Sequence, residues 1–449
     1  MYYDNDGRGS APGYLRKTMG LKLKTPFFGW YLVGVTIIAF TLVYGIRVSF
    51  SVFFAPVLDE FDWYRGSTAI MLSLNILVYG LTAPFAGSLV DRWKPRRVVV
   101  LGILLLTVST GACFFASELW HFYLLFGVMV PIGTAFTGSP VLSPALMNWF
   151  GKRRGLAIGI GQMGGGLSFA YVTGIETVVT NWGWRPAFLV MGGLVLVLLL
   201  PLYLVFYYYH PRDHGLKPYT SGEDSAFDEG PAGTVKPGLA VRPDWTLRSA
   251  LRTYNLWLLV FSDFCYWGIG NYLVLAHQIK FAQDAGYSGL VAASVFAFFG
   301  IVSIAGQVMA SISDKIGRET TVLIAAVLSI GALVALVSVK DTSHPWLLYV
   351  YAIASGLGTG LFSPNIIVGT ADIFHGRNIG AIAAVLLTGV GFGGAIGPWL
   401  GGYIYDIRGS YNVAFIIAMA AFAAAGISYW IAAPRHAAKI RARLQGNDQ

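Results

Sequence analysis

The stretch Gly87–Val98, GSLVDRWKPRRV, places one acid, Asp91, and four bases in a short turn between two long apolar segments. A weaker copy of this turn, ASISDKIGRETT, runs from Ala310 to Thr321 and has its acid at Asp314. Asp91 and Asp314 are 223 positions apart, which is about half of the 449 residues. This spacing predicts a chain built as two halves of one plan.

The composition of such a turn suits the joint between two membrane helices. Small residues allow the helices to touch, and charged residues meet water. Asp91 can accept hydrogen bonds at the N-terminus of the next helix, and the bases hold the loop on the cytoplasmic side. An ordinary positive loop is the alternative, but two copies half a chain apart argue against it. We therefore expect Asp91, Arg92 and Asp314 to make gating or loop contacts.

The composition indicates a protein that faces lipid. Hydrophobic residues make up 55% of the chain and charged residues only 12%, whereas a soluble protein has about 25% charged residues. The net charge is +9, but the bases are distributed among loops and form no basic face. We expect a lipid bilayer as partner and no nucleic acid.

Apolar segments of the length that spans a bilayer recur along the whole chain. Twelve are predicted, centred near residues 42, 77, 107, 134, 167, 195, 265, 300, 330, 357, 391 and 421. An even number places both termini on one side. Five bases fall in the loops of the other side: Arg65, Arg185, Lys280, Lys340 and Arg408. Since Arg47 lies within a span, 25 of the 31 Lys and Arg residues remain on the side of the termini. The positive-inside rule makes that side cytoplasmic, in a multi-pass protein of the plasma (inner) membrane.

The predicted fold is an all-α membrane protein with two pseudo-symmetric six-helix bundles related by an axis along the membrane normal. The expected organisation is a cytoplasmic tail over 1–27, a first bundle over 28–209, a cytoplasmic linker over 210–250, a second bundle over 251–433 and a cytoplasmic tail over 434–449. No cleavable signal peptide is expected. Cys113 and Cys265 lie in apolar spans and are expected to be free buried thiols, so no cofactor or metal is predicted.

Two spans have marked local features. The fourth contains Pro131, Pro140 and Pro144, which predict a bend. The fifth, GLAIGIGQMGGGLSFAYVTG, begins at Gly155 and has a face almost free of side-chain bulk, where another helix can approach closely. This face is either a plain packing seam or a seam that slides during transport, and the two interpretations are compatible.

Twelve spans arranged six plus six, a central linker and the Gly-x-x-x-Asp-Arg pattern from Gly87 to Arg92 resemble the major facilitator superfamily, over residues of about 28 to 433. The turn departs from the family pattern at Lys94, where glycine is usual. A finer resemblance, to the monocarboxylate porter branch and the related oxalate/formate exchangers, rests on Gly29-Trp30, on WFGKRRGLAIGIGQMGGGLS from Trp149 to Ser168, and on GWRPAF after it. The resemblance implies transport of small organic anions, commonly with a proton.

The eighth span departs from that branch. Members often place a basic residue there, whereas the stretch GIVSIAGQVMAS, Gly300–Ser311, has no charge and only Gln307 as a large polar side chain. The substrate class therefore has to be argued from charges elsewhere in the spans.

Four ionisable residues fall within spans: Arg47, Glu176, Asp263 and His277. A charge at this depth costs about 2.5–3.5 kcal/mol on insertion scales, so it is expected to face a cavity or a partner. Arg47 is 17 residues past Trp30, about 25 Å along a helix, too deep to reach the cytoplasm. We expect its guanidinium to hold a substrate carboxylate through two hydrogen bonds. The alternatives are a structural ion pair and a helix end that reaches the outer headgroups.

The other three ionisable residues receive different roles. Asp263 lies about a third of the way into the seventh span, and an acid at such a depth is typical of proton relays. The alternatives for Asp263 are a partner for a base and a capping acceptor near Gly268 or Gly270. Glu176 and His277 lie near outer ends and are predicted to make gate or loop contacts.

Several uncharged polar residues lie at a plausible depth for a cavity and are predicted to contact substrate, although each alone is more often a helix-to-helix hydrogen bond. They are Tyr44, Tyr79, Gln162, Tyr266, Asn271 and Asn365.

These residues predict a secondary active transporter that moves a small organic monoanion, a monocarboxylate bound at Arg47, with a proton and by alternating access. One alternative is efflux of amphipathic drug-like compounds, which the aromatic content and the single basic site favour. Another is a membrane sensor or structural protein that binds the same ligand without moving it. An enzyme is not expected, because the spans contain no paired carboxylates, His-rich metal cluster or nucleophile–base arrangement.

Overall fold

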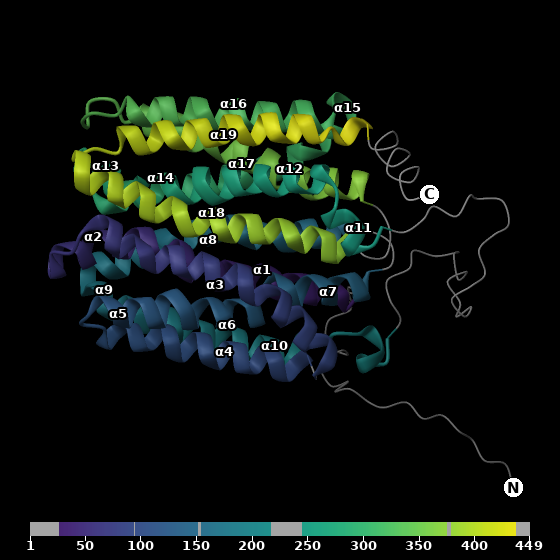
Figure 1. Ribbon diagram of the computed structural model, residues 1–449. Helices are drawn as coiled ribbons and strands as arrows, with labels where there is room; N and C mark the ends of the chain where they lie inside the picture. The colour runs from purple at the N-terminus through teal and green to yellow at the C-terminus, as the bar shows by residue number, and fades with distance from the viewer. Residues whose placement is uncertain (1–26, 94, 151–153, 217–244, 375–378, 437–449) are drawn as a thin grey trace, which may run out of the picture.

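The computed structural model describes residues 27–93, 95–150, 154–216, 245–374 and 379–436, and the regular structure of these residues is helical. The long helices lie side by side along one axis (Figure 1). One end of the bundle contains the start of the first helix, Gly29, and the end of the last, Ala432; we call it the terminal end. The opposite end, called the far end, contains Asp62, which lies between the helix that ends at Phe61 and the helix that begins at Arg65. The tail residues 1–26 and 437–449 and most of the linker, 217–244, lie outside the described residues.

The first half contains six long helical segments, several of them made of consecutive helices. They are α1 (Gly29–Val48) with α2 (Phe50–Phe61); α3 (Arg65–Arg92); α4 (Pro95–Ala112) with η2 (Cys113–Phe115); α5 (Leu119–Phe122), η3 (Tyr123–Met129), α6 (Val130–Thr137) and α7 (Ser139–Trp149); α8 (Arg154–Trp182); and α9 (Trp184–Leu194), η4 (Val195–Leu199) and α10 (Leu200–Phe206), followed by η5 (Pro211–His214).

The second half repeats this pattern after a short helix, α11 (Leu247–Leu251). Its six segments are α12 (Tyr254–Asp263), η6 (Phe264–Asn271) and α13 (Tyr272–Asp284); α14 (Gly289–Met309), η7 (Ala310–Ile312) and α15 (Ser313–Ile316); α16 (Arg318–Val337); α17 (Trp346–Ile373); α18 (Ile379–Arg408); and α19 (Asn412–Ala432), followed by η8 (Pro434–His436).

Eleven of these segments, counted over the described residues, are long and apolar enough to cross a membrane. The remaining one is α8, a helix of 29 residues whose many glycines make it less apolar. The all-α architecture predicted from the sequence is therefore confirmed.

Two local features follow from proline and glycine. The fourth segment is interrupted at Gly138, between α6 and α7, and Pro140 lies in the first turn of α7, so the bend predicted there is confirmed. The segments η3, η4 and η6 are π-helices, a type of helix that often occurs at functional sites.

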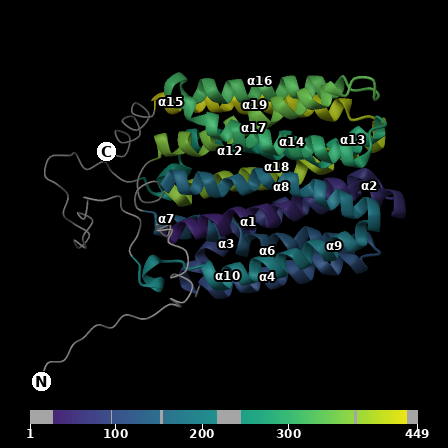
Figure 2. The ribbon, with the colours of Figure 1, turned by 180° about the vertical axis from the view of Figure 1, so that it is seen from behind.

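Each half has its own apolar core. One buried cluster draws almost all of its members from residues before the linker, and the other almost all from residues after it. The halves meet along two seams, where α3 packs against α18 and α8 packs against α14. Figure 2 shows α8 next to the helices of the second half. Glycines make both seams close: a Cβ on Gly80 would lie 3.2 Å from the Cα of Gly391.

Candidate functional site

The side chain of Arg47 lies in the last turn of α1 and is only 6% exposed. Arg47 is 18 residues after the first residue of α1, about 27 Å along the helix and near the middle of the α1–α2 segment. Its Nε donates a 2.8 Å hydrogen bond to Oδ1 of Asn75, and its Nη2 is buried without a partner. The ion pairs among the described residues do not include Arg47. This guanidinium is therefore neither neutralised by an acid nor extended to the bilayer surface.

Two tyrosines of the first half surround the guanidinium. The Cζ of Arg47 lies 4.3 Å from the ring centre of Tyr79 and 6.0 Å from that of Tyr44. The two hydroxyls are 3.3 Å apart, and the backbone amide of Ser139 donates to the hydroxyl of Tyr44 at 3.4 Å. That amide is available because the helix is interrupted at Gly138. Helices α1, α3 and α7 thus build one wall of the site.

The second half contributes Tyr272, the first residue of α13. It packs against the apolar cores of both halves. Trp267, in η6, lies beside Tyr272 with ring centres 5.8 Å apart. The site around Arg47 therefore lies between the two halves.

Neither Asn75 nor Tyr272 was among the predicted substrate contacts. Asn75 could have been suspected, because an uncharged amide in the middle of an apolar span needs hydrogen-bonding partners. Tyr272 gave no such signal, because a tyrosine at the middle of a span also packs well in an apolar core.

The predicted residues of the second half have partners inside their own bundle. The hydroxyl of Tyr266 bonds to Ser329 at 2.7 Å, and its ring stacks on Phe362 with centres 3.7 Å apart. Asn271 accepts from Thr359 at 3.2 Å, and Asn365 donates to the carbonyl of its own helix at Leu361. Gln162 is partly buried on α8. The structure brings Tyr44, Tyr79 and Arg47 together and places Tyr266, Asn271 and Asn365 in the core of the second half.

Asp263 is the last residue of α12 and is 4% exposed. Its Oδ1 is buried and has no hydrogen-bond partner. Asp263 is nine residues from the start of α12, about 14 Å, so it lies nearer the terminal end than Arg47. The π-helix η6 begins directly after it. Asp263 is thus an isolated buried acid in the second half, at a different depth from the guanidinium.

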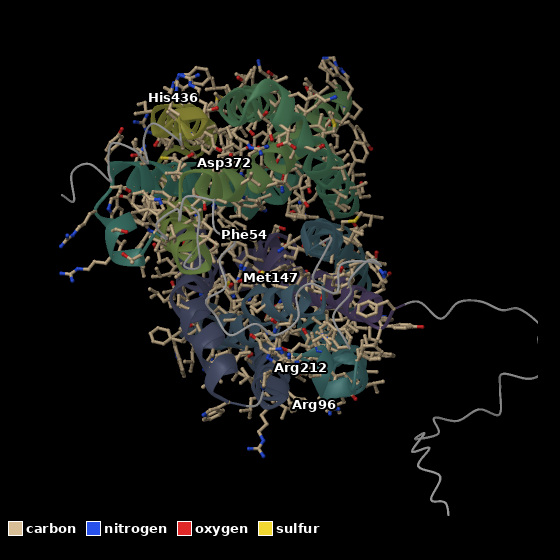
Figure 3. The ribbon with its side chains drawn as sticks, turned by 90° about the vertical axis from the view of Figure 1, so that its right-hand side faces the viewer. Phe54, Arg96, Met147, Arg212, Asp372 and His436 are labelled. Atoms are coloured by element: carbon tan, nitrogen blue, oxygen red, sulfur yellow. The ribbon has the colours of Figure 1, made fainter. Side chains whose placement is uncertain are left out.

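The predicted gate residues near the far end lie at the interface between halves. His277 is fully buried: its Nε2 lies 2.8 Å from the carbonyl oxygen of Pro398, and its ring meets Phe54 of the first half at 5.1 Å between centres. Figure 3, seen from the terminal end, shows Phe54 between the two halves. Glu176 of α8 is 5% exposed, and its carboxylate contacts Gly289 at the start of α14.

The repeated turns lie at the terminal end. Asp314 forms a 2.6 Å ion pair with Arg318, which also pairs with Asp372 of α17 at 3.3 Å. In the first copy, Asp91 and Arg92 end helix α3, but their side chains lie outside the described residues. The second turn is therefore tied to α17 by charged contacts.

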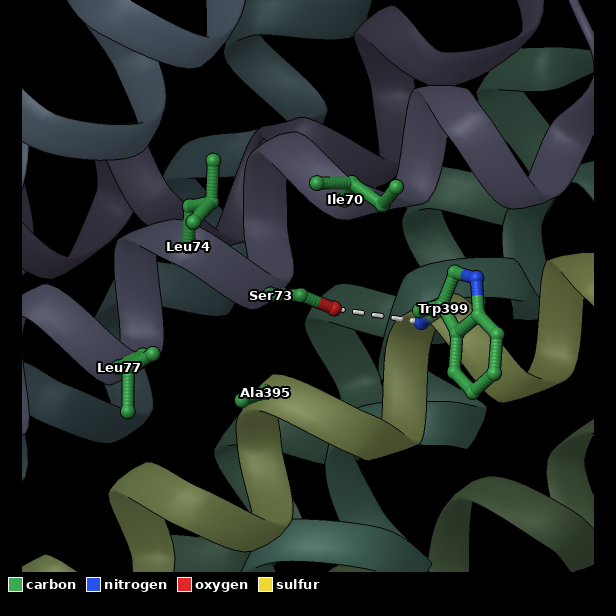
Figure 4. A pocket seen from close by; sticks show the side chains of 6 residues that line it. All are labelled: Ile70, Ser73, Leu74, Leu77, Ala395 and Trp399. Carbon is green, nitrogen blue, oxygen red and sulfur yellow. Dashed lines mark hydrogen bonds between the residues drawn. The ribbon is translucent and has the colours of Figure 1, made fainter.

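A shallow apolar groove of about 230 Å³ follows the seam between α3 and α18. Ser73 and Trp399 lie on its opposite sides and are joined by a 3.3 Å hydrogen bond from the backbone amide of Trp399 to Oγ of Ser73 (Figure 4). The other lining residues are Ile70, Leu74, Leu77 and Ala395. This groove contains no charged side chain and is separate from the Arg47 site.

Comparisons with known proteins agree with the fold. The sequence model of the Major Facilitator Superfamily matches residues 35–343 and 308–447. The bacterial homologue of the human lysosomal transporter Spinster, solved in an inward-facing and unoccupied conformation, superposes with a TM-score of 0.66 over 94% of this chain and 98% of that chain, at 18% identity.

Named relatives align over most of the chain. "Monocarboxylate transporter 13" of Rattus norvegicus is 29% identical over 91% of this chain and 89% of its own length. "Monocarboxylate transporter 11" of Homo sapiens is 26% identical over 87% and 80%, respectively. An uncharacterised transporter of the same superfamily from Bacillus subtilis, YcxA, is 24% identical over 86% and 91%. The chain therefore belongs to the Major Facilitator Superfamily, as an integral multi-pass transporter and not an enzyme.

Proposed function

We propose that the protein carries a small organic monoanion, a monocarboxylate, across the plasma membrane by alternating access and together with a proton. The observation that supports this most directly is the buried guanidinium of Arg47, which has an unpartnered Nη2 and, among the described residues, no acid as a fixed counter-charge. One uncompensated cation in a low-dielectric site calls for one negative charge from a ligand. A carboxylate satisfies both the charge and the hydrogen-bonding requirement.

The surroundings of Arg47 favour a small organic acid over an inorganic ion. Tyr44 and Tyr79 lie beside the guanidinium with their rings and hydroxyls, and Tyr272 packs against the cores of both halves. Rings can cover the carbon atoms of the ligand, and hydroxyls can donate to its oxygens. The names of the relatives, which refer to monocarboxylate transport, support the same class.

Alternating access is supported by the position of the site between two separately packed halves. Substrate at Arg47 and Tyr272 touches both halves, so a rocking motion about this point would expose it to each side in turn. At the far end the halves are joined by charged contacts, among them Arg65 with Asp284 at 2.6 Å and Lys280 with Asp59 at 3.8 Å. With the termini in the cytoplasm, as the distribution of Lys and Arg predicts, this arrangement is closed toward the outside.

Asp263 is the proposed carrier of the proton. It is buried, has an oxygen without a partner, and no ion pair among the described residues includes it. Because it lies well away from Arg47 along the helix axis, the proton and the anion are coupled through the conformation of the second half and not by direct contact.

Uptake into proteoliposomes tests this function. Wild-type protein should accumulate a radiolabelled acid from a panel of acetate, propionate, pyruvate and benzoate when a pH gradient is imposed, and should not take up the matching amides. Counterflow without net uptake would indicate exchange without a proton, and uptake of neutral or cationic amphiphiles alone would indicate drug efflux. Binding of an acid without movement would indicate a sensor.

A further inference from the structure

We infer that Asn75 is the residue that positions the Arg47 guanidinium for the anion. This inference rests on the proposed function. Asn75 is fully buried on α3 and lies between two partners: its Oδ1 accepts from Nε of Arg47 at 2.8 Å, and its Nδ2 donates to the carbonyl oxygen of Phe126 at 2.7 Å. Asn75 therefore joins the proposed anion site in α1 to the π-helix η3.

The carbonyl that holds Asn75 is free because of the local backbone. In an α-helix the amide of Val130 would donate to the carbonyl of Phe126. At the end of η3 it donates instead to Leu125, one residue further back. The next residue, Pro131, has no N–H to offer. A carbonyl buried in a membrane helix needs a donor, and the Nδ2 of Asn75 supplies it.

The two partners of Asn75 allow only one orientation of its amide. A guanidinium can only donate hydrogen bonds, and a carbonyl oxygen can only accept them. Turning the amide of Asn75 over would place its NH2 group against Nε of Arg47 and its oxygen against the oxygen of Phe126, losing both bonds. The amide oxygen is therefore fixed toward Arg47.

This contact determines which part of the guanidinium remains for a ligand. Asn75 occupies Nε, and the ring of Tyr79 covers one face at 4.3 Å. Nη2 is buried and has no partner. The outer edge of the guanidinium, which includes Nη2, therefore remains available to a carboxylate. This edge is already held in position before the carboxylate binds. Such preorganisation increases affinity because less side-chain freedom is lost on binding.

The neutrality of Asn75 is as important as its position. An aspartate of nearly the same shape at this place would put a carboxylate beside Nε and neutralise Arg47 permanently. Asparagine supplies the acceptor oxygen without the charge. The structure thus orients the cation and leaves its charge for the substrate.

The test compares three variants in proteoliposomes, using the acid of the panel that wild-type protein takes up fastest. Asn75→Asp should raise KM at least tenfold, because it gives Arg47 an internal counter-ion. It also removes the donor to the carbonyl of Phe126, so its thermal unfolding midpoint is measured to show that the protein is folded. Asn75→Leu removes the acceptor oxygen and should also raise KM. If Asn75→Leu fails to fold, Asn75→Asp still decides the question, since it keeps the acceptor for Nε. Asn181→Asp, at an exposed asparagine near the end of α8, controls for the added charge and should keep wild-type KM.

Uptake by the Arg47→Gln protein separates this inference from the proposed function. If both are right, Arg47→Gln should abolish uptake and Asn75→Asp should raise KM. If Arg47→Gln abolishes uptake but Asn75→Asp keeps wild-type KM, the positioning role of Asn75 is wrong and the anion site stands. If Arg47→Gln transports like wild type, or if wild-type protein takes up no acid of the panel, the proposed function is wrong and the role of Asn75 with it.

Discussion

Arg65, the first residue of α3, forms a 2.6 Å ion pair with Asp284, the last residue of α13. This pair joins the first half to the second at the far end. The same guanidinium donates to the hydroxyl of Tyr411 at 2.8 Å, and Asp406 of α18 accepts from the backbone amides of Arg65 and Gly66 at 2.9 and 2.7 Å. At the far end, the Asp406 carboxylate thus joins the N-terminus of α3 to α18, and the ion pair of Arg65 joins α3 to α13.

The first prediction is that Arg65→Ala favours opening of the far end. Removing hydrogen bonds to a charged group destabilises the closed arrangement by about 1.5–3 kcal/mol, which raises the open fraction roughly tenfold or more. The reporter is Ala276→Cys, because Ala276 of α13 is fully buried in the core of the first half. With Cys113 and Cys265 replaced by alanine, a membrane-impermeant maleimide added at the far side should label Cys at 276 faster in the Arg65→Ala protein.

Arg408→Ala is the matched control for that experiment. Arg408 is also an arginine at the far end, but it is exposed at the end of α18. Its replacement should leave the labelling rate at the wild-type value. Equal labelling of the Arg65→Ala and Arg408→Ala proteins would show that the Arg65 contacts do not hold the far end closed.

The second prediction concerns the ring of Tyr79 under the guanidinium. A cation–π contact of this kind contributes about 0.5–2 kcal/mol, or roughly 2- to 30-fold in affinity. Tyr79→Leu removes the ring and should raise the Kd of the transported acid by that factor. Tyr79→Phe keeps the ring and removes only the 3.3 Å hydrogen bond to Tyr44, so it should have the smaller effect. Similar Kd values for the two variants, measured by calorimetry, would show that the ring face does not support Arg47.

The third prediction concerns Asp263 as the proton carrier. Asp263→Asn cannot release a proton, so a pH gradient should no longer stimulate uptake, whereas counterflow of the acid should continue. The measurement is the initial uptake rate with and without the gradient. Asp341→Asn, at an exposed position between α16 and α17, should respond to the gradient like wild type. Normal stimulation of the Asp263→Asn protein would exclude Asp263 from the coupling.

The fourth prediction uses two neighbouring glycines of α8. A Cβ on Gly166 would collide with Ile304 and lie 3.0 Å from the carbonyl oxygen of Gly300, both in α14 across the seam. A Cβ on Gly165 would meet open space. Gly166→Ala should therefore lower the free energy of unfolding by about 1–3 kcal/mol, and Gly165→Ala should leave it nearly unchanged. Thermal unfolding in detergent measures both.

Uptake by the same two proteins distinguishes a static seam from a sliding one. If α8 and α14 move against each other during transport, Gly166→Ala should also lower kcat. A destabilised protein with wild-type kcat would indicate that the seam between α8 and α14 serves packing alone.

The architecture could be predicted from the sequence because bilayer thickness sets the length of each apolar segment and charges mark the turns. The distance from Asp91 to Asp314 indicated two halves before any helix was placed. The depth of Arg47 followed from counting residues along a helix. Each of these inferences depends on position along the chain, which the sequence states directly.

Which side of each helix contacts its neighbours could not be predicted in this way. Tyr266 and Asn271 lie at suitable depths but bond within the second half, and depth alone does not distinguish a cavity from a core. The contact of Asn75 with Arg47 depends on the rotation of α3. It also depends on the register of η3, where one shifted hydrogen bond frees the carbonyl of Phe126.

The most direct test of the account is the binding of small acids to purified wild-type, Arg47→Gln and Arg47→Lys proteins, measured by thermal shift with propionate and benzoate and with their amides as neutral controls. We expect the acids and not the amides to raise the unfolding temperature of the wild-type protein, with a weaker effect on Arg47→Lys, which keeps the charge but loses the planar donor edge. The acids should have no effect on a folded Arg47→Gln protein. An equal shift of the wild-type and Arg47→Gln proteins by the acids would contradict the account, because the anion would then bind without the buried guanidinium.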